Sequence, residues 1–280
     1  MYNIPFTKMH GLGNDYIYIN CIDRCIDDPQ SLSVEISDRH KGVGADGIVL
    51  ILKSECADFK MKMYNSDGSE GDMCGNACRC IARYVYDKNL TDKTHISIET
   101  NAGIKYATVN VENDKVIDVT VDMGKANFSP ESVPANSDTE IIGMPITIND
   151  SIYKITALSV GNPHCVIFTD DINRISFAGP QLENHNLFPS KVNVELAERN
   201  SVDTTNVRVW ERGSGETMSC GTGACAVAVA AKRLFNAPDR QTICMPGGNL
   251  KIYLNPENEH IYLTGEAEFV FEGIYNRRSI

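Results

Sequence analysis

Apolar and polar residues alternate along much of the chain, a pattern that predicts a protein built mainly of short β-strands. Other short runs are continuously apolar, as in strands that are buried on both faces. The predicted strands are residues 16–20, 47–52, 59–64, 95–100, 115–122, 156–160, 164–168, 206–210, 250–254 and 260–264. We therefore expect a β-rich fold that contains few helices.

Helical spacing of apolar residues is clear at two places, each directly after a cysteine. One segment follows Cys74 and continues past Val85, and the other follows Cys220 and runs to Phe235. The Asn-Ala-Pro sequence at 236–238 is a typical stop signal for the second helix. These are the only two helices that the pattern predicts clearly.

The surroundings of the two cysteines repeat each other. Residues 61–80 align over residues 207–226 without a gap, so that an alternating strand, a polar loop, a Cys-Gly pair and a helix follow in the same order. Two unrelated strand–turn–helix units remain the alternative, but two similar halves explain the shared order better. The segment 127–140 has two prolines, three serines and few large apolar residues, which favours it as the connection between the halves.

Composition and charge narrow the class of protein. The 280 residues are 42% hydrophobic, enough for one large or two medium-sized domains. A net charge of −11 makes nucleic acid and anionic membranes poor partners. No apolar run approaches the roughly 20 residues of a membrane span, and the first residues lack a signal-peptide core. We therefore expect a cytoplasmic protein.

The chain has ten cysteines, a high number for its length. No pair has the C-x-x-C spacing of zinc or thioredoxin-like sites, and disulfide frameworks are typical of short secreted chains. We expect most of these cysteines to be small, buried and reduced, and we expect no metal site.

Cys74 and Cys220 require a different explanation, because each stands at the start of a predicted helix. Free N–H groups and the helix dipole at that position lower the pKa of a thiol and can bind a carboxylate. Two such thiols on opposite faces of one carbon can invert it, one removing a proton and the other supplying one. Buried helix-start residues or a structural disulfide are the alternatives.

Several longer stretches resemble the diaminopimelate epimerase family, and the resemblance runs from residue 1 to about residue 273. The stretches that carry it are residues 9–15 (MHGLGND), 38–47 (DRHKGVGADG), 64–70 (YNSDGSE), 73–76 (MCGN), 161–164 (GNPH), 193–195 (NVE), 208–217 (RVWERGSGET) and 220–225 (CGTGAC). The last two stretches are highly specific.

The resemblance implies an α/β fold with α+β-type mixed sheets, in two pseudo-symmetric halves. Each half would be a curved mixed β-sheet wrapped around a central helix, with the active site in the cleft between the halves. The implied domains are residues 1–122, completed by a C-terminal strand at 267–280, and residues 123–266. The implied activity is conversion of LL-diaminopimelate to the meso form without pyridoxal phosphate, another cofactor or a metal. The family also implies a cytoplasmic homodimer that serves lysine and peptidoglycan synthesis.

The family pattern assigns a role to each matching residue. Cys74 and Cys220 are the acid/base pair, and in the LL-to-meso direction Cys220 accepts the proton and Cys74 donates one. His164 and Glu211 support the reacting centre. The residues that match substrate-binding positions are Asn14, Asn65, Gly75, Asn76, Asn162, Asn193, Glu211, Arg212, Gly221 and Thr222.

The two halves differ where an asymmetric substrate would require it. Asn65-Ser66 corresponds to Glu211-Arg212, and Gly47 corresponds to Asn193. Arg212 can bind a carboxylate through its fork of donors, so we expect it to read the non-reacting end of the substrate. A solvated surface charge pair is the alternative interpretation of Glu211 and Arg212.

Three positions depart from the family pattern. Gly47 stands where some members have a substrate-contacting side chain, Ala77 replaces a frequent glycine, and Phe271 replaces a tyrosine of the dimer contact. A racemase acting on another amino acid or on a diaminopimelate analogue such as lanthionine remains the alternative enzyme. A thiol redox protein and a non-enzymatic binding module are the alternatives from other classes.

Overall fold

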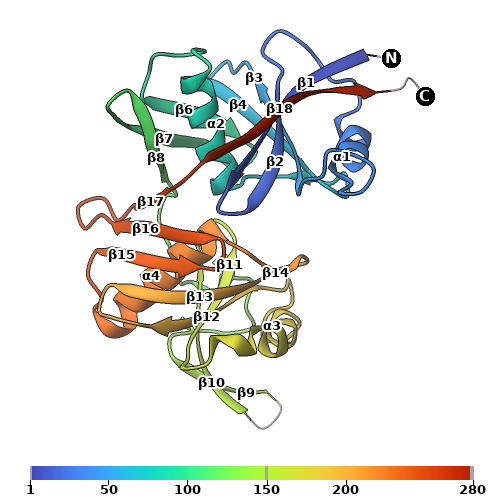
Figure 1. Cartoon of the computed structure of the whole chain (residues 1–280). Helices are drawn as coiled ribbons and strands as arrows, with labels where there is room; N and C mark the ends of the chain where they lie inside the picture. Colours follow the sequence, from blue (N-terminus) through green and yellow to red (C-terminus); the bar gives the residue numbers. More distant parts are fainter. Residues whose placement is uncertain (1, 149–150, 278–280) are drawn as a thin grey trace. The chain divides into compact units, whose positions relative to one another are not determined.

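The computed structural model describes residues 2–148 and 151–277 and divides the chain into two compact units (Figure 1). Unit 1 comprises Met1–Val121 and Gly265–Ile280, and unit 2 comprises Asp122–Thr264. Residues 278–280 of the expected C-terminal strand lie outside the described residues. Each unit combines a mixed β-sheet with α-helices, which confirms the expected fold class.

The sheet of unit 1 has the strand order β18-β1-β2-β3-β4-β6-β7. Its pairs β2–β3 and β4–β6 are parallel and the others are antiparallel. The short strand β5 (Glu70–Gly71) extends the pairing at the end of β4. The principal strands are β1 (Tyr2–Gly11), β2 (Asn14–Asn20), β3 (Gly47–Leu52), β4 (Phe59–Asn65), β6 (His95–Thr100), β7 (Gly103–Glu112) and β18 (Glu268–Arg277).

A tight turn connects β7 to β8 (Lys115–Asp122). Its two residues, Asn113 and Asp114, both have positive φ, 49° and 59°. Asparagine and aspartate tolerate this left-handed conformation, which two-residue hairpin turns require. The turn chemistry therefore specifies a hairpin at this point of the chain.

The sheet of unit 2 repeats the pattern of unit 1, in the order β9-β10-β11-β12-β13-β15-β16-β17. Here β11–β12 and β13–β15 are parallel and the other pairs are antiparallel. The short strand β14 (Gly215–Thr217) pairs with β13, as β5 pairs with β4. The principal strands are β9 (Met144–Ile148), β10 (Ser151–Ser159), β11 (Pro163–Phe168), β12 (Asn193–Arg199), β13 (Thr204–Glu211), β15 (Arg240–Met245), β16 (Gly248–Leu254) and β17 (Ile261–Gly265).

The predicted helices after the two cysteines are present as α2 (Gly75–Asp87) and α4 (Gly221–Phe235). Most of α4 is buried, including a run of alanines along its length. A helix that is apolar on nearly all sides belongs in a core, and its small side chains let the surrounding strands approach closely. The helix ends at Asn236, which adopts the left-handed conformation with φ 52°.

Two further helices, α1 (Pro29–Ser37) and α3 (Ile175–Glu183), were not predicted. Each has nine residues, and they occupy the same place in the two halves. Apolar spacing is weak in α1 because two of its buried residues are serines, one of which, Ser33, donates to the carbonyl oxygens of Tyr64 and Asn65. In α3, Gly179 packs against Trp210 so closely that a Cβ would lie 2.6 Å from the Trp210 Cβ.

The segment 127–140 lies inside unit 2, whereas the sequence favoured it as the connection between the halves. Asn127 forms a β-bridge with Ser159, and Val133 is buried in the core cluster of this unit together with Ile141. The segment contains a 3-10 turn, Pro130–Ser132, instead of serving as a linker. The polar composition of the segment therefore predicted its irregular backbone, but not its packing against the core of unit 2.

No helix in the part of the chain that the structure describes is both long and apolar enough to cross a membrane.

Candidate functional site

Cys74 and Cys220 occupy equivalent positions, each as the residue that precedes the first turn of a helix. Cys74 has φ −135° and ψ 122°, and Cys220 has φ −132° and ψ 113°, so both have extended backbone. Neither thiol caps its helix by a side-chain hydrogen bond. The sequence repeat therefore corresponds to a repeated local structure, with one thiol at each helix start.

The Cys74 thiol lies beside two asparagines of the predicted site. Its Sγ donates to Oδ1 of Asn14 over 3.4 Å, and Nδ2 of Asn76 donates to the same oxygen over 3.2 Å. Asn14 begins β2, whereas Asn76 and the neighbouring Gly75 lie in the first turn of α2. Unit 1 thus brings three other predicted residues, Asn14, Gly75 and Asn76, next to the Cys74 thiol.

Arg79 lies beneath this group and was not identified from the sequence. It is fully buried, and its Nη2 donates to Oδ1 of Asn76 over 2.7 Å while its Nε donates to the Glu266 carbonyl oxygen over 3.2 Å. Its Nη1 has no hydrogen-bond partner among the described residues. Burial lowers the pKa of Arg79. Close packing here depends on Gly11, where a Cβ would lie 2.9 Å from Nη2 of Arg79.

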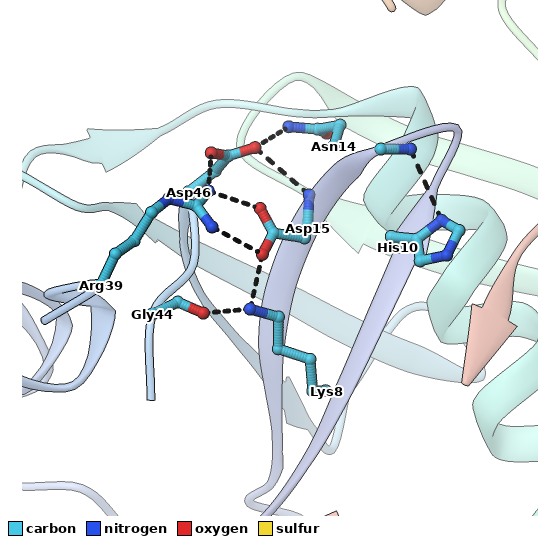
Figure 2. A network of polar contacts seen from close by, with 8 residues as sticks. Lys8, His10, Asn14, Asp15, Arg39, Gly44 and Asp46 are labelled. Carbon is cyan, nitrogen blue, oxygen red and sulfur yellow. Dashed lines mark hydrogen bonds and ion pairs between the residues drawn. The ribbon is translucent and has the colours of Figure 1, made fainter. Parts of the chain in front are cut away.

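A network of charged residues holds Asn14 from the other side (Figure 2). Nδ2 of Asn14 donates to Oδ2 of Asp46 over 2.9 Å, and Arg39 bridges Asp46 and Asp15 with distances of 2.9 and 2.7 Å. Lys8 binds Asp15 and the Gly44 carbonyl oxygen. Asp15, Arg39, Gly44 and Asp46 lie in stretches that resemble the family, but the sequence analysis did not assign them to the site.

Asn65 lies at the end of β4, and its amide donates to Oγ of Ser69 over 3.0 Å. The structure therefore holds the side chain of this predicted residue in its own turn. Its strand partner is Gly47, where a Cβ would lie 2.1 Å from the Tyr64 carbonyl oxygen and 3.0 Å from the Asn65 Cα. This crowding gives a physical reason for glycine at a position that departs from the family pattern.

Cys220 has a more enclosed and more acidic environment. It is 5% exposed, and its Sγ lies 3.4 Å from the hydroxyl of Thr222. Burial raises the pKa of Cys220 well above the usual value, and the nearby carboxylates of Glu211 and Glu195 raise it further. The expectation of a lowered thiol pKa at the helix start is therefore wrong for Cys220, because desolvation and the two carboxylates dominate.

Glu211 ends β13 beside Cys220. Burial raises the pKa of Glu211, and hydrogen bonds with Thr217 and Cys220 oppose the shift. Its Oε1 accepts the Thr217 hydroxyl over 2.5 Å. A carboxyl group with a raised pKa in hydrogen-bonding reach of a thiol can exchange a proton with it at a pH nearer to neutral.

His164 lies in β11 and is completely buried. Its Nδ1 is 2.7 Å from Oε1 of Glu195, and its Nε2 is 2.9 Å from Oδ1 of Asn162. The other oxygen of Glu195, Oε2, has no hydrogen-bond partner within the described residues. Glycine at 223 permits this arrangement, because a Cβ there would lie 2.8 Å from Oε1 of Glu195.

The sequence did not assign Glu195 to the site, although it belongs to a quoted stretch. A glutamate between Val194 and Leu196, in the buried part of a strand, is the signal that could have identified it.

Asn193 and Arg212 adjoin these groups, because Asn193 is the strand partner of His164 and Arg212 directly follows Glu211. The Asn193 amide donates to the Pro163 carbonyl oxygen over 2.8 Å and accepts the Arg212 backbone N–H over 2.9 Å. Both ends of this amide therefore support backbone, which is a structural task. Among the described residues, the Arg212 side chain makes a 3.4 Å hydrogen bond from Nη1 to the Ser190 carbonyl oxygen, a weak contact that an anion could replace.

No group of three or more His, Cys, Asp and Glu side chains suited to a metal ion occurs in residues 2–148 and 151–277. Each unit does collect polar groups beside its own helix start: asparagines lie beside the Cys74 thiol, and Glu211 and Glu195 lie near the Cys220 thiol. These are groups for proton transfer and for binding a polar ligand.

The fold of the chain is shared by several solved proteins. A PhzF-family phenazine biosynthesis protein from Bacillus anthracis superposes with a TM-score of 0.73 at 17% identity, covering 99% of this chain and 100% of that chain. A hydroxyproline epimerase from Agrobacterium vitis gives a TM-score of 0.68 at 13% identity, covering 98% and 91%. At these identities the likeness defines the fold class, that of two-unit proteins with mixed sheets.

Nearly the whole sequence also matches one family at much higher similarity. The model of the family described as diaminopimelate epimerase matches residues 6–129 and 156–270. A diaminopimelate epimerase of Acetivibrio thermocellus is 49% identical over 271 residues, covering 96% of this chain and 97% of the relative. One of Methanococcus maripaludis strain C6 is 50% identical over 273 residues, covering 96% and 99%. The chain belongs to the diaminopimelate epimerase family, as its sequence motifs predicted.

Proposed function

We propose that the protein interconverts LL-2,6-diaminopimelate and its meso isomer without a cofactor, in the biosynthesis of lysine and peptidoglycan precursors. One observation carries the proposal: in a member of this family, Cys74 and Cys220 stand at equivalent helix starts, in two units of the same topology. A two-base reaction needs two equivalent thiols on opposite faces of the reacting carbon. A reaction that needs one nucleophile does not explain the second thiol.

The proposed reaction begins at Cys220 in the LL-to-meso direction. Glu211 hydrogen-bonds to this thiol and has a raised pKa, so it accepts the thiol proton as the substrate binds. The Cys220 thiolate then removes the α-proton, and Cys74 protonates the opposite face from its own thiol. The roles are exchanged in the reverse direction. His164, held between Glu195 and Asn162, keeps the buried charges around Cys220 in place.

Binding of the substrate is proposed to use the starts of α2 and α4. Backbone N–H groups at Gly75-Asn76 and Gly221-Thr222 would bind the α-carboxylate and stabilise the charge that develops on it as the proton leaves. Asn14, Asn65, Asn162 and Asn193 are the proposed polar contacts, with Asn193 acting through the backbone that it supports. Arg212 is proposed to bind the distal carboxylate.

We also propose a cytoplasmic homodimer. Strand β18 exposes the large apolar side chains of Val270, Phe271 and Ile274, which a second copy of the chain would cover. Phe271 packs edge-to-face on Phe6 with centroids 5.8 Å apart, so it is fixed in this surface. Light scattering of wild type and the Phe271→Asp variant tests this assembly, and a monomeric wild type would contradict it.

Exchange of the α-hydrogen with deuterated water tests the activity. Wild type incubated with LL-diaminopimelate should produce the meso isomer and incorporate one solvent deuterium for each inversion. Cys74→Ala and Cys220→Ala should each abolish inversion, whereas Cys25→Ala, which removes an exposed cysteine elsewhere, should leave it unchanged. Inversion in the double alanine variant, or inversion of lanthionine or another amino acid in place of diaminopimelate, would contradict the proposal.

A further inference from the structure

The oxygen atom that faces Cys74 belongs to an amide whose two ends are chemically different. Oδ1 of Asn14 accepts from the Cys74 thiol and from Nδ2 of Asn76. Nδ2 of Asn14 points the other way and donates to Oδ2 of Asp46 over 2.9 Å, as Figure 2 shows. If the amide rotated by half a turn, the thiol would face a donor instead of an acceptor.

The contacts run from Asp46 through the amides of Asn14 and Asn76 to Arg79, and the charged groups at the two ends fix the orientation of both amides. An ionised carboxylate only accepts hydrogen bonds, so the part of Asn14 that faces Asp46 must be the amide nitrogen. A guanidinium only donates, so the part of Asn76 that faces Arg79 must be the oxygen, over 2.7 Å. The nitrogen of Asn76 then faces the oxygen of Asn14, and all of these contacts are satisfied by one arrangement.

Asp46 is itself held in place by several contacts. Its Oδ1 accepts from Arg39 over 2.9 Å, and its Oδ2 also accepts the Asp15 backbone N–H over 3.2 Å. Its backbone N–H donates to the Asp15 carbonyl oxygen over 2.8 Å, and its carbonyl oxygen accepts the Ser66 N–H over 2.9 Å. The carboxylate therefore has one position from which it can orient Asn14.

We propose that Asp46 is a positioning residue that keeps the oxygen of Asn14 turned toward Cys74, so that this thiol is held in its protonated, proton-donating form. An acceptor oxygen stabilises an S–H group and repels a thiolate, whereas an amide N–H would stabilise the thiolate. The inference rests on the proposed function only in assigning Cys74 the role of proton donor. The contact itself can be tested without any substrate.

Several titratable groups other than Asp46 also act on Cys74. Titratable neighbours that interact electrostatically with Cys74 include Arg79, Cys78 and Cys80 on α2 and Tyr18 on β2. An Asp46 variant also removes a negative charge, which affects the Cys74 thiol separately from the orientation of the Asn14 amide. Asp15 provides the matched control, because its carboxylate binds the same Arg39 but does not bind the Asn14 amide.

The test is the pH dependence of iodoacetamide alkylation at Cys74, followed by peptide mass spectrometry on the full chain. Asp46→Asn should lower the pH midpoint of alkylation by about one unit, which corresponds to roughly tenfold faster alkylation below the midpoint. Asp15→Asn should shift it much less, and Asp46→Glu should restore most of the wild-type midpoint. Thermal unfolding of each variant confirms that it is folded at the temperature of the assay.

Two results would overturn the inference: an unchanged midpoint in folded Asp46→Asn, or an equal shift in Asp15→Asn. Turnover supplies an independent measurement, in which Asp46→Asn should lower kcat in the LL-to-meso direction more than it raises KM. If the alkylation midpoint shifts as expected but wild type does not invert diaminopimelate, the contact stands and the proposed function fails.

Discussion

Oε1 of Glu195 lies 2.7 Å from Nδ1 of His164, and both side chains are completely excluded from solvent. A buried carboxyl group and a buried imidazole stabilise each other's position. Removing either one leaves the other buried without its partner, which lowers the free energy of unfolding. The pair lies next to the start of α4, since Gly223 approaches both Glu195 and the Cys220 thiol. Its integrity should therefore affect both stability and proton transfer.

Replacing Glu195 by Gln should lower kcat by roughly 10²-fold, because the amide keeps the shape but not the charge that orients His164. The free energy of unfolding should fall by about 2 kcal/mol. Steady-state kinetics and denaturant unfolding measure the two effects. Glu198→Gln, on the same strand but partly exposed, is the control and should change neither. Normal kcat in folded Glu195→Gln would contradict a role for this pair.

The titration of Cys220 should depend on Glu211. Burial and two negative neighbours raise the pKa of Cys220, so its thiolate should form only well above pH 9 in the free enzyme. Glu211→Gln removes one of those charges and should lower the pKa, which means that thiolate appears at a lower pH than in wild type.

Thiolate absorbance in the ultraviolet, taken as the difference from Cys220→Ser, measures this titration. Glu216→Gln, which alters a partly exposed carboxylate paired with Arg208, should leave it unchanged. A Glu211→Gln variant whose Cys220 titrates at higher pH than wild type would show that the carboxylate does not act as a negative neighbour.

Arg212 should determine the recognition of the distal carboxylate. Arg212→Ala should reduce kcat/KM for diaminopimelate by about 10²-fold or more, the loss expected for a charge-assisted hydrogen bond. Arg208→Ala is the control, because that arginine already pairs with Glu216 at 2.5 Å. The assignment fails if Arg212→Ala keeps the kcat/KM of wild type.

Gly47 should not tolerate a side chain. Gly47→Ala places a methyl group against the Tyr64 carbonyl oxygen, so the free energy of unfolding should decrease by about 2 kcal/mol. Gly71→Ala is the matched control, since its nearest atoms belong to the flexible Met63 side chain and can move. Equal stability of wild type and Gly47→Ala would show that the strand shifts without cost.

The sequence predicted those features that repeat along the chain. The helix starts at Cys74 and Cys220 were found because the same strand, loop and helix occur twice, and β3, β6 and β8 match their predicted bounds. The helices α1 and α3 were missed because serine and glycine occupy positions where the pattern requires apolar residues.

Other features depend on neighbours that are distant in sequence. The raised pKa of Cys220 results from burial and from Glu195 and Glu211, which helix position alone does not reveal. Asp46 and Arg79 belong to separate stretches, and their relation to Cys74 is visible only when Asn14 and Asn76 are placed between them.

Strand β18 has a consequence for the order of folding during synthesis. It pairs with β1 along nearly its whole length, so the last strand of the chain completes the sheet that the first strand begins. Unit 2 is one continuous segment, whereas unit 1 is divided between the two ends of the chain. On the ribosome, unit 2 can fold as soon as it has emerged. Strand β1, in contrast, can pair with β18 only after almost the entire chain has been translated. Until then β1 presents an unpaired strand edge, which makes the N-terminal half of the nascent chain the part most exposed to aggregation and to chaperones.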